Sequence, residues 1–154
     1  MKKQLFIVCL LTLLALPGIV FAANHEHSGH GTKTKGDMHK GMLTVGEQTV
    51  DGVKAIVYLN DVKATMAKMG MKETHHLMIH LYNAKDGKTL EEGVVAVKIT
   101  GPDGKEGGAI KMIGMDAHFG ADIVIDRKGV YLFTAGTQLK DGVKRQFELK
   151  YELQ

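Results

Sequence analysis

The chain of 154 residues has very few of the nucleophilic side chains that hydrolytic and redox enzymes use. Its single cysteine, Cys9, lies inside an apolar N-terminal segment, and Ser28 is its only serine. No HExxH run and no phosphate-binding glycine loop occurs in the sequence. The Asp-Gly pairs at 51–52, 86–87, 103–104 and 141–142 are turn signals rather than acid–base dyads. We therefore expect a protein that is not an enzyme and that is stabilised by a packed core without disulfides.

The chain also lacks an apolar run long enough for a comfortable membrane span. Lys2 and Lys3 precede the apolar stretch 5–16, and Val20-Phe21-Ala22 places small residues at the −3 and −1 positions of a cleavage site. This pattern predicts a secretory signal peptide over 1–22, cleaved near Ala22, and a periplasmic location with no membrane attachment after cleavage. An uncleaved anchor is the alternative.

Clusters of basic residues are absent as well. Loss of Lys2 and Lys3 with the signal peptide lowers the formal net charge from +3 to +1. A nearly neutral chain argues against nucleic acid as a partner and against electrostatic docking on membranes.

Two regions follow the signal peptide. Residues 23–42 are rich in Gly, His, Lys, Ser and Thr and poor in large aliphatic residues, which predicts a flexible tail containing His and Met. Residues 43–154 alternate apolar and polar positions between glycine-rich turns. Strands are expected over 53–59, 75–82, 94–100, 109–113, 120–125, 129–135 and 146–153. The fold class is therefore all-β, an Ig-like antiparallel β-sandwich of about seven strands. Residues 61–72 are ambiguous between a short helical turn and an irregular loop.

Soft metal ligands are abundant in this chain. All eight histidines and eight of the nine methionines follow the signal peptide, and they gather in three groups. The groups are His25, His27, His30, Met38, His39 and Met42; then Met66, Met69, Met71, His75, His76, Met78 and His80; then Met112, Met115 and His118. Thioether and imidazole ligands together suit copper, above all Cu(I), better than magnesium or calcium.

The strand at 75–82 places His76, Met78 and His80 on one face, because alternate side chains of a strand point the same way. Leu77 and Ile79 supply the core face, so the His/Met row faces outward or toward the mouth of the sandwich. His76 and His80 would lie about 13 Å apart along a straight strand, so one of them with ligands from elsewhere is the expected arrangement. A merely polar outer face is the alternative.

The segment from Met112 to Gly120 predicts a loop between strands, because Gly114 and Gly120 punctuate it. Such a loop at one end of a sandwich can turn Met115 and His118 inward together, and we consider them the best ligand pair. Met112 is a further candidate ligand or, as is common for methionine, a core residue. Asp116 could be a hard ligand, or it could accept a hydrogen bond that fixes an imidazole tautomer.

Cleavage after Ala22 would begin the mature chain at Ala23-Asn24-His25. The free amine, two amide nitrogens and the imidazole of His25 would form a square-planar nitrogen set that favours Cu(II) or Ni(II). An incidental histidine in a polar tail is the alternative.

The stretch from Gly114 to Ile123, followed by Gly129-Val130-Tyr131, resembles a group of exported Ig-like metal-binding proteins. It is similar to the periplasmic iron-transport-associated (Tpd) group and to the YtkA-like and FixH-like domains. The resemblance implies that His118 and a nearby methionine bind copper with a histidine of an earlier Ile-His-Leu strand. Ile79-His80-Leu81 matches that strand, and His76-Leu77 is a second alignment.

Two departures from the Tpd pattern argue against iron transport. No histidine follows His118, and Tyr82, or Met78 in the second alignment, replaces the acidic residue expected two positions after the strand histidine. The remaining site is richer in methionine and favours Cu(I).

The sequence thus predicts an exported copper carrier or buffer in the periplasm that passes its metal to a protein partner. The ligands would be Met115, His118 and His80 or His76, completed by Met69, Met71 or Met112. The alternative is a non-catalytic interaction or accessory subunit of a periplasmic transport or redox complex, with a link to iron.

Overall fold

The computed structural model of the protein describes residues 41–154. The expected signal peptide 1–22 and the expected tail, apart from Gly41 and Met42, lie outside the described residues, and so does His25. The described part contains nine strands and one helix. In chain order these are β1 (Leu43–Val50), β2 (Val53–Asp61), α1 (Lys63–Lys68), β3 (His75–Asn83), β4 (Gly93–Thr100), β5 (Ile110–Lys111), β6 (Ile113–Met115), β7 (His118–Ile123), β8 (Gly129–Leu139) and β9 (Lys144–Leu153).

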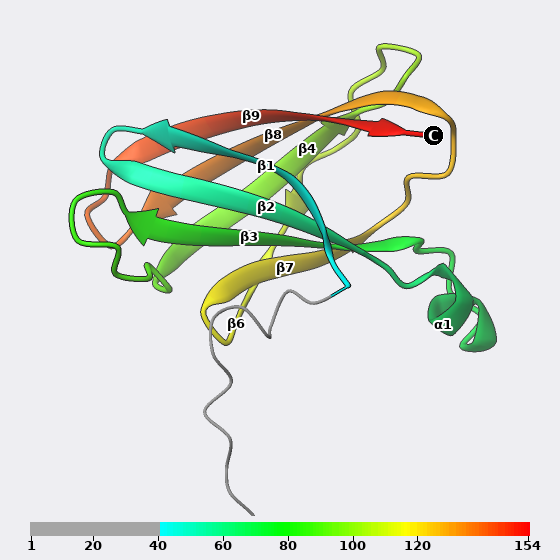
Figure 1. Cartoon of the computed structure of the whole chain (residues 1–154), viewed down its shortest axis with the longest axis horizontal. Helices are drawn as coiled ribbons and strands as arrows, with labels where there is room; N and C mark the ends of the chain where they lie inside the picture. The colour runs from blue at the N-terminus through cyan, green and yellow to red at the C-terminus, as the bar shows by residue number, and fades with distance from the viewer. Residues whose placement is uncertain (1–40) are drawn as a thin grey trace, which may run out of the picture. The chain divides into compact units, whose positions relative to one another are not determined.

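The strands form two antiparallel sheets, which are the two layers of Figure 1. One sheet has the order β1-β2-β3-β7-β6 and the other has the order β5-β4-β8-β9. On one side the layers meet where β1 lies beside β9, and the Glu148 amide donates to Gln48 Oε1 at 2.7 Å. Short strands, β6 and β5, form the other two sheet edges. The expected all-β Ig-like sandwich is confirmed.

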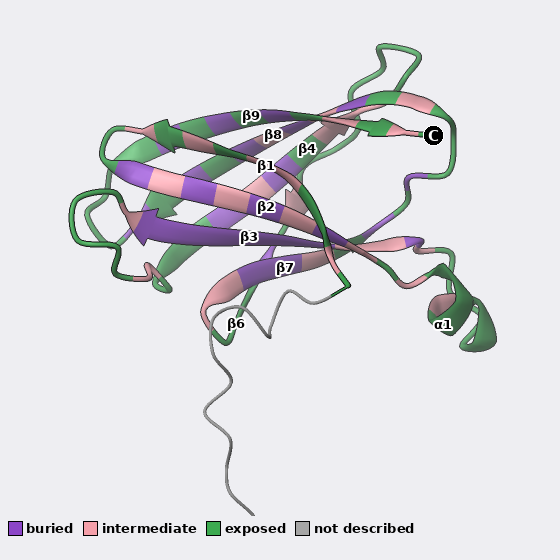
Figure 2. Cartoon of the chain, viewed as in Figure 1, coloured by how far each residue is buried: buried purple, intermediate pink, exposed green. Residues whose placement is uncertain are grey.

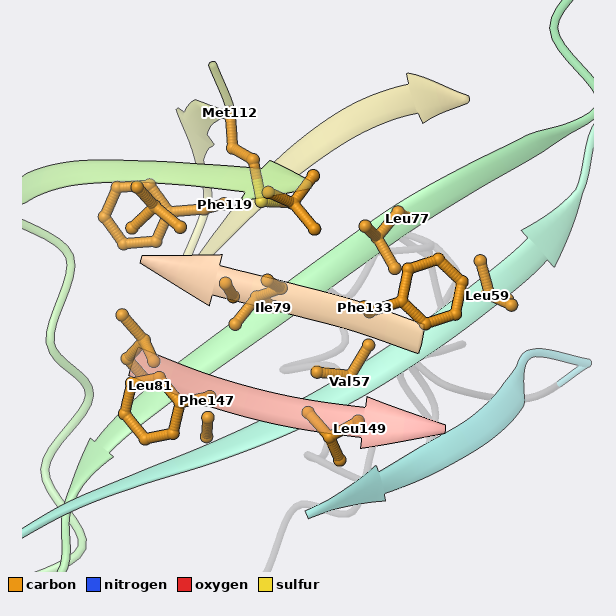
Figure 3. Packing of buried hydrophobic residues seen from close by; sticks show 14 of the residues in the cluster. Val57, Leu59, Leu77, Ile79, Leu81, Met112, Phe119, Phe133, Phe147 and Leu149 are labelled. Atoms are coloured by element: carbon orange, nitrogen blue, oxygen red, sulfur yellow. The ribbon is translucent and has the colours of Figure 1, made fainter. Parts of the chain in front are cut away.

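The hydrophobic core lies between the two sheets, as strand periodicity requires. Val57 and Leu59 of β2 and Leu77 and Ile79 of β3 point from one sheet toward the other (Figure 3). The opposing sheet contributes fully buried aromatic side chains, of which Phe133 and Phe147 are the largest. The residues that the alternation predicted for the core in the strands 53–59 and 75–82 are therefore found there.

The seven strands of six or more residues agree with the expected number, but one expected region differs. The stretch expected as one strand over 109–113 contains the two-residue β5, and it ends at Ile113, the first residue of β6. Met112 stands between these strands, with its amide donating to the Val95 carbonyl at 2.9 Å. β1, for which no strand was expected, is the seventh long strand.

The ambiguous stretch 61–72 forms the connection between β2 and β3. The amide of Val62 donates to the carbonyl of Thr74 at 3.0 Å, which closes the base of this connection. Within it, α1 spans only six residues and buries none of them. Over residues 41–154, no helix has the length and apolar character needed to cross a membrane.

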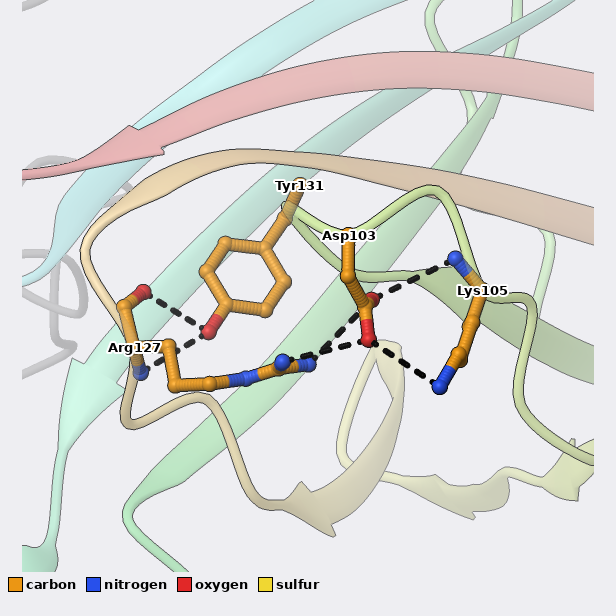
Figure 4. Close-up of polar contacts among 4 residues, drawn as sticks. All are labelled: Asp103, Lys105, Arg127 and Tyr131. Atoms are coloured by element: carbon orange, nitrogen blue, oxygen red, sulfur yellow. Dashed lines mark hydrogen bonds and ion pairs between the residues drawn. The ribbon is translucent and has the colours of Figure 1, made fainter.

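A tyrosine of β8 is hydrogen-bonded to the segment just before this strand, as in the tyrosine corner of Ig-like sandwiches. The Tyr131 hydroxyl donates to the Arg127 carbonyl at 2.8 Å and accepts from the Arg127 amide at 3.0 Å (Figure 4). The Arg127 guanidinium pairs with both carboxylate oxygens of Asp103 at 3.2 and 3.3 Å, which ties the loop after β4 to this corner. Through this hydrogen bond, Arg127 holds the pKa of the Asp103 carboxyl below its ordinary value.

Candidate metal centre

The face of β3 that points away from the core carries His76, Met78, His80 and Tyr82. In a half-exposed sheet these positions would be solvent-exposed, yet Met78 and His80 are each only 4% exposed. Figure 2 accordingly shows β3 as buried along most of its length, whereas β2 alternates. The row expected to face outward is thus on the predicted face of the sheet, but it is largely buried.

A tight hairpin brings Met115 and His118 beside this row. Met115 of β6 pairs directly with His118 of β7, and only Asp116 and Ala117 lie between them. Ala117 adopts a left-handed backbone conformation with φ of 68°. The expectation of a longer loop at one end of the sandwich was wrong, because β6 adds to the edge of β7. The hairpin still places Met115 and His118 together, since directly paired residues of antiparallel strands share a face.

The ring of His118 lies near both histidines of the β3 row. Its centroid is 5.1 Å from that of His80, with an interplanar angle of 26°, and 6.3 Å from that of His76, with an angle of 88°. His76 and His80 are four residues apart in the strand, so they approach His118 from two sides. The sequence left open which of them accompanies His118, and the structure places both of them near it.

Gly120 lies below this group and has no side chain. It pairs with Met78 across the β3–β7 ladder, so its missing side chain would point into the His/Met face. A Cβ atom there would lie 2.8 Å from His76 Nε2 and would overlap the Met115 Cε atom. The close approach of Met115 and His76 therefore depends on a residue without a side chain.

Hydrogen bonds at Nδ1 fix the imidazole tautomers of two histidines. His76 Nδ1 lies 2.6 Å from Asp122 Oδ1, and His118 Nδ1 lies 3.2 Å from the Asp116 carbonyl oxygen. Because carboxylate and carbonyl oxygens only accept, each neutral ring carries its proton on Nδ1. Nε2 then keeps its lone pair, which is the state that a metal-binding histidine requires. Asp116 acts through its backbone rather than through its side chain.

Two tyrosines flank His80 on the same face. The Tyr58 ring meets the His80 ring edge-on with centroids 5.4 Å apart, and the Tyr82 ring stacks on it at 6.3 Å. Burial raises the pKa of both phenols, with a further rise at Tyr58 from Glu47 and at Tyr82 from Tyr58. Both phenols are therefore neutral near neutral pH, and Tyr82 supplies no negative charge where the resemblance implies a carboxylate.

The structure does not bring every candidate ligand to this group. Met112 lies in the hydrophobic core and is 3% exposed, which is the core alternative that the sequence left open (Figure 3). Met69 and Met71 follow α1, and Figure 1 shows this part of the chain well apart from the β6–β7 hairpin. His25 lies outside the described residues.

Imidazole and carboxylate groups alone do not complete a site. Among residues 41–154, no three His, Cys, Asp or Glu side chains are grouped so that they could hold a metal ion. A centre at this place therefore needs the thioether of Met115 beside the imidazoles.

Sequence reasoning missed Gly120 and Asp122. Both act across the β3–β7 ladder, in which Gly120 pairs with Met78 and Asp122 pairs with His76. The available signal was the spacing His118-x-Gly120-x-Asp122, which places the three on one face of a strand.

Comparisons with solved structures identify proteins of the same fold. FetP of uropathogenic Escherichia coli strain F11 matches with a TM-score of 0.56 and 14% identity, over 73% of this chain and 98% of FetP. A copper-bound variant of FetP matches with a TM-score of 0.55 and 14% identity, over 73% of this chain and 95% of the variant. A DUF4426 family protein of Pseudomonas aeruginosa PAO1 matches with a TM-score of 0.52 and 15% identity, over 74% of this chain and 95% of its own.

No family model and no curated protein sequence matches the chain. The similarity to FetP extends to the fold, and membership of the Tpd, YtkA-like or FixH-like groups remains a prediction.

Proposed function

We propose that the chain is an exported copper-binding protein that carries or buffers Cu(I) in the periplasm and has no catalytic activity of its own. The observation that carries this proposal is the convergence of the Met115 thioether and His76 Nε2 above Gly120, with the His118 ring beside them. These residues come from three different strands, so the fold itself assembles the group.

The donor set favours Cu(I) over harder ions. Met115 offers a thioether, and His76 and His118 each offer an Nε2 lone pair. The carboxylate of Asp122 is engaged by His76, and the neighbouring phenols of Tyr58 and Tyr82 are neutral. Thioether and imidazole without carboxylate is a soft ligand set, which Cu(I) prefers and which Mg²⁺ and Ca²⁺ do not.

The accessibility of the group suits a carrier. Met115 is 38% exposed on the edge strand β6, and His118 is half-buried, whereas His80 lies deeper. An ion held by these side chains would be anchored on the inner side and reachable from the outer side. A partner could then replace Met115 first and remove the ion without unfolding the sandwich.

The comparisons support copper as the first metal to test, because one of the structures with this fold is a copper-bound FetP variant. The signal peptide pattern at 1–22 supports export, and the periplasm is the compartment in which the carrier would act.

Anaerobic titration of the mature protein with Cu(I) against a competing chelator tests the proposal. We expect wild-type protein to compete with the chelator, and we expect a Met115→Ala/His118→Ala variant to compete much less. Equal competition by the two proteins would refute the proposed site. Thermal unfolding of both proteins without metal serves as the folding control.

A second candidate function is an accessory subunit that binds a protein partner of a periplasmic transport or redox complex. The observation that favours it is the exposed apolar edge strand β6, in which Ile113 is 67% exposed next to Met115. Metal analysis of the purified protein together with partner capture separates the two functions. A metal-free protein that captures a partner through β6 would favour the accessory role.

A further inference from the structure

The connection between β2 and β3 contains three methionines in six positions, namely Met66, Met69 and Met71. None of the three belongs to the core: Met66 is half-buried within α1, and Met69 and Met71 follow that helix. Met69 is 60% exposed and Met71 is 44% exposed. Isolated exposed apolar residues are common on protein surfaces, but two exposed thioethers beside a half-buried third in one short turn call for a specific explanation.

Backbone hydrogen bonds hold the main chain of the three methionines close together. The amides of Met69 and Met71 both lie 3.0 Å from the carbonyl oxygen of Met66, to which they donate. Met66 and Met69 are also three residues apart, which places their Cβ atoms about 5–6 Å apart on one side of a helical turn. Because methionine is unbranched and has three rotatable bonds, such side chains can bring their sulfur atoms to a common position.

The charges within the turn disfavour hard cations. Residues 62–72 contain no carboxylate, and Lys63, Lys68 and Lys72 are distributed along them. Carboxylates occur only at the borders, in Glu73 and in Asp61, whose Oδ1 accepts from the Lys63 amide at 2.9 Å. Mg²⁺ and Ca²⁺ depend on carboxylate and carbonyl oxygens, so this turn offers them little. A soft monovalent ion, which binds thioether sulfur strongly, fits it best.

We propose that Met66, Met69 and Met71 form a second, solvent-exposed site for Cu(I), separate from the group around Gly120. The hydrogen bond between Val62 and Thr74 closes the base of the connection, so the turn is a compact unit that can bind an ion without changing the sandwich. His75 and His76 directly follow Thr74, so the base of the connection adjoins the N-terminal end of β3, where the histidine row begins, whereas the methionines lie apart from the β6–β7 hairpin (Figure 1). The turn would capture the ion first and deliver it toward His76. This inference adds a site to the proposed copper carrier, and the three-methionine site can exist whether or not the central group binds.

Methyl NMR with Ag(I) as a closed-shell substitute for Cu(I) tests the site on the mature chain. The protein carries ¹³C-labelled methionine ε-methyl groups, and single Met→Leu variants assign the signals. In a Met115→Leu/His118→Gln variant, we expect the signals of Met66, Met69 and Met71 to shift together with a common midpoint. Unchanged signals, or three separate midpoints, would overturn the proposal.

A Met66→Leu/Met69→Leu/Met71→Leu variant provides the complementary test. Leucine is similar in size and favours helices, and α1 buries no residue, so the thermal unfolding midpoint should not change. We expect this variant to lose one class of bound Ag(I) while the Met115 signal still shifts. Retention of all the bound silver would also overturn the proposal. In the wild-type protein, an unchanged Met115 signal together with shifted signals of Met66, Met69 and Met71 would instead refute the central site alone.

Discussion

His76 Nδ1 lies 2.6 Å from Oδ1 of Asp122, its direct partner across the β3–β7 ladder. The ladder sets this distance, because directly paired residues point to the same side of the sheet. The carboxylate keeps the imidazole proton on Nδ1 and directs Nε2 toward Gly120 and Met115. Asp122 is therefore a residue that positions a ligand without being one.

Replacing Asp122 with asparagine should weaken Cu(I) binding by about 10–100-fold, the usual effect of losing such a support. The amide can donate to Nδ1 and so favour the tautomer that has its proton on Nε2. Chelator competition measures the affinity, and Asp116→Asn is the matched control, because Asp116 supports His118 through its carbonyl oxygen. Equal losses in the two variants would contradict this role of Asp122.

Replacing Gly120 with alanine should impair Cu(I) binding and leave the sandwich folded. The new Cβ would lie 2.8 Å from His76 Nε2 and would displace the end of the Met115 side chain. Gly114→Ala in the same hairpin is the control, since its Cβ would meet nothing closer than the Phe119 ring at 3.7 Å. Circular dichroism and Cu(I) competition of both variants check the prediction. If Gly120→Ala binds as tightly as Gly114→Ala, the close approach at Gly120 is unimportant for binding.

Particular residues show how far the sequence predicts this fold. Leu77, Ile79 and Leu81 alternate so regularly that their strand and its core face follow from the pattern alone. β1 was missed, because it is an edge strand whose side chains are mostly exposed or half-buried, and this blurs the alternation. The Met115–His118 hairpin was predicted as a loop because Gly114 and Gly120 punctuate the segment. The two-residue turn itself gave no signal, since its left-handed position holds Ala117 rather than the usual Gly or Asn.

The candidate site was predictable in its ligand types but not in its assembly. Periodicity placed His76 and His80 on one face, yet it could not show which other strand lies beside β3. That pairing brings Gly120 and Asp122 opposite Met78 and His76, and it depends on the register of two strands far apart in the sequence. The hydrophobic pattern shows which face of each strand is buried, but no hairpin turn joins β3 to β7, so it does not show which residues pair.

Acid should remove the stabilisation that Asp103 contributes through Arg127. The hydrogen bonds from Arg127 lower the pKa of Asp103 from its ordinary 3.8, so the folded state binds this proton less readily than the unfolded state. The contribution is therefore present above pH 3.8 and disappears as the pH falls through the lower pKa of the folded state. Urea unfolding of wild type and Asp103→Asn over this range should show a difference at neutral pH that vanishes in acid.

The same substitution in an Arg127→Gln background should show a much smaller pH-dependent difference, because the largest cause of the lowered pKa is gone and only the backbone hydrogen bonds, chiefly from Lys105, still lower it. The hydrogen bonds of Tyr131 use only the backbone of Arg127, so the corner itself should persist. A full pH effect of Asp103→Asn without Arg127 would assign the stabilisation to another partner.

Met112 and Met115 are three residues apart and should respond in opposite ways to leucine. Met112 is buried in the core, so Met112→Leu should change the free energy of unfolding by less than about 1.5 kcal/mol and leave Cu(I) affinity unchanged. Met115 is 38% exposed beside His118, so Met115→Leu should leave stability nearly unchanged and reduce Cu(I) affinity, because leucine keeps the volume and removes the sulfur. Urea unfolding and chelator competition on both variants measure the two effects. If Met112→Leu lost Cu(I) affinity and Met115→Leu did not, the thioether ligand would lie in the core. That result would contradict the proposed site on β6 and β7.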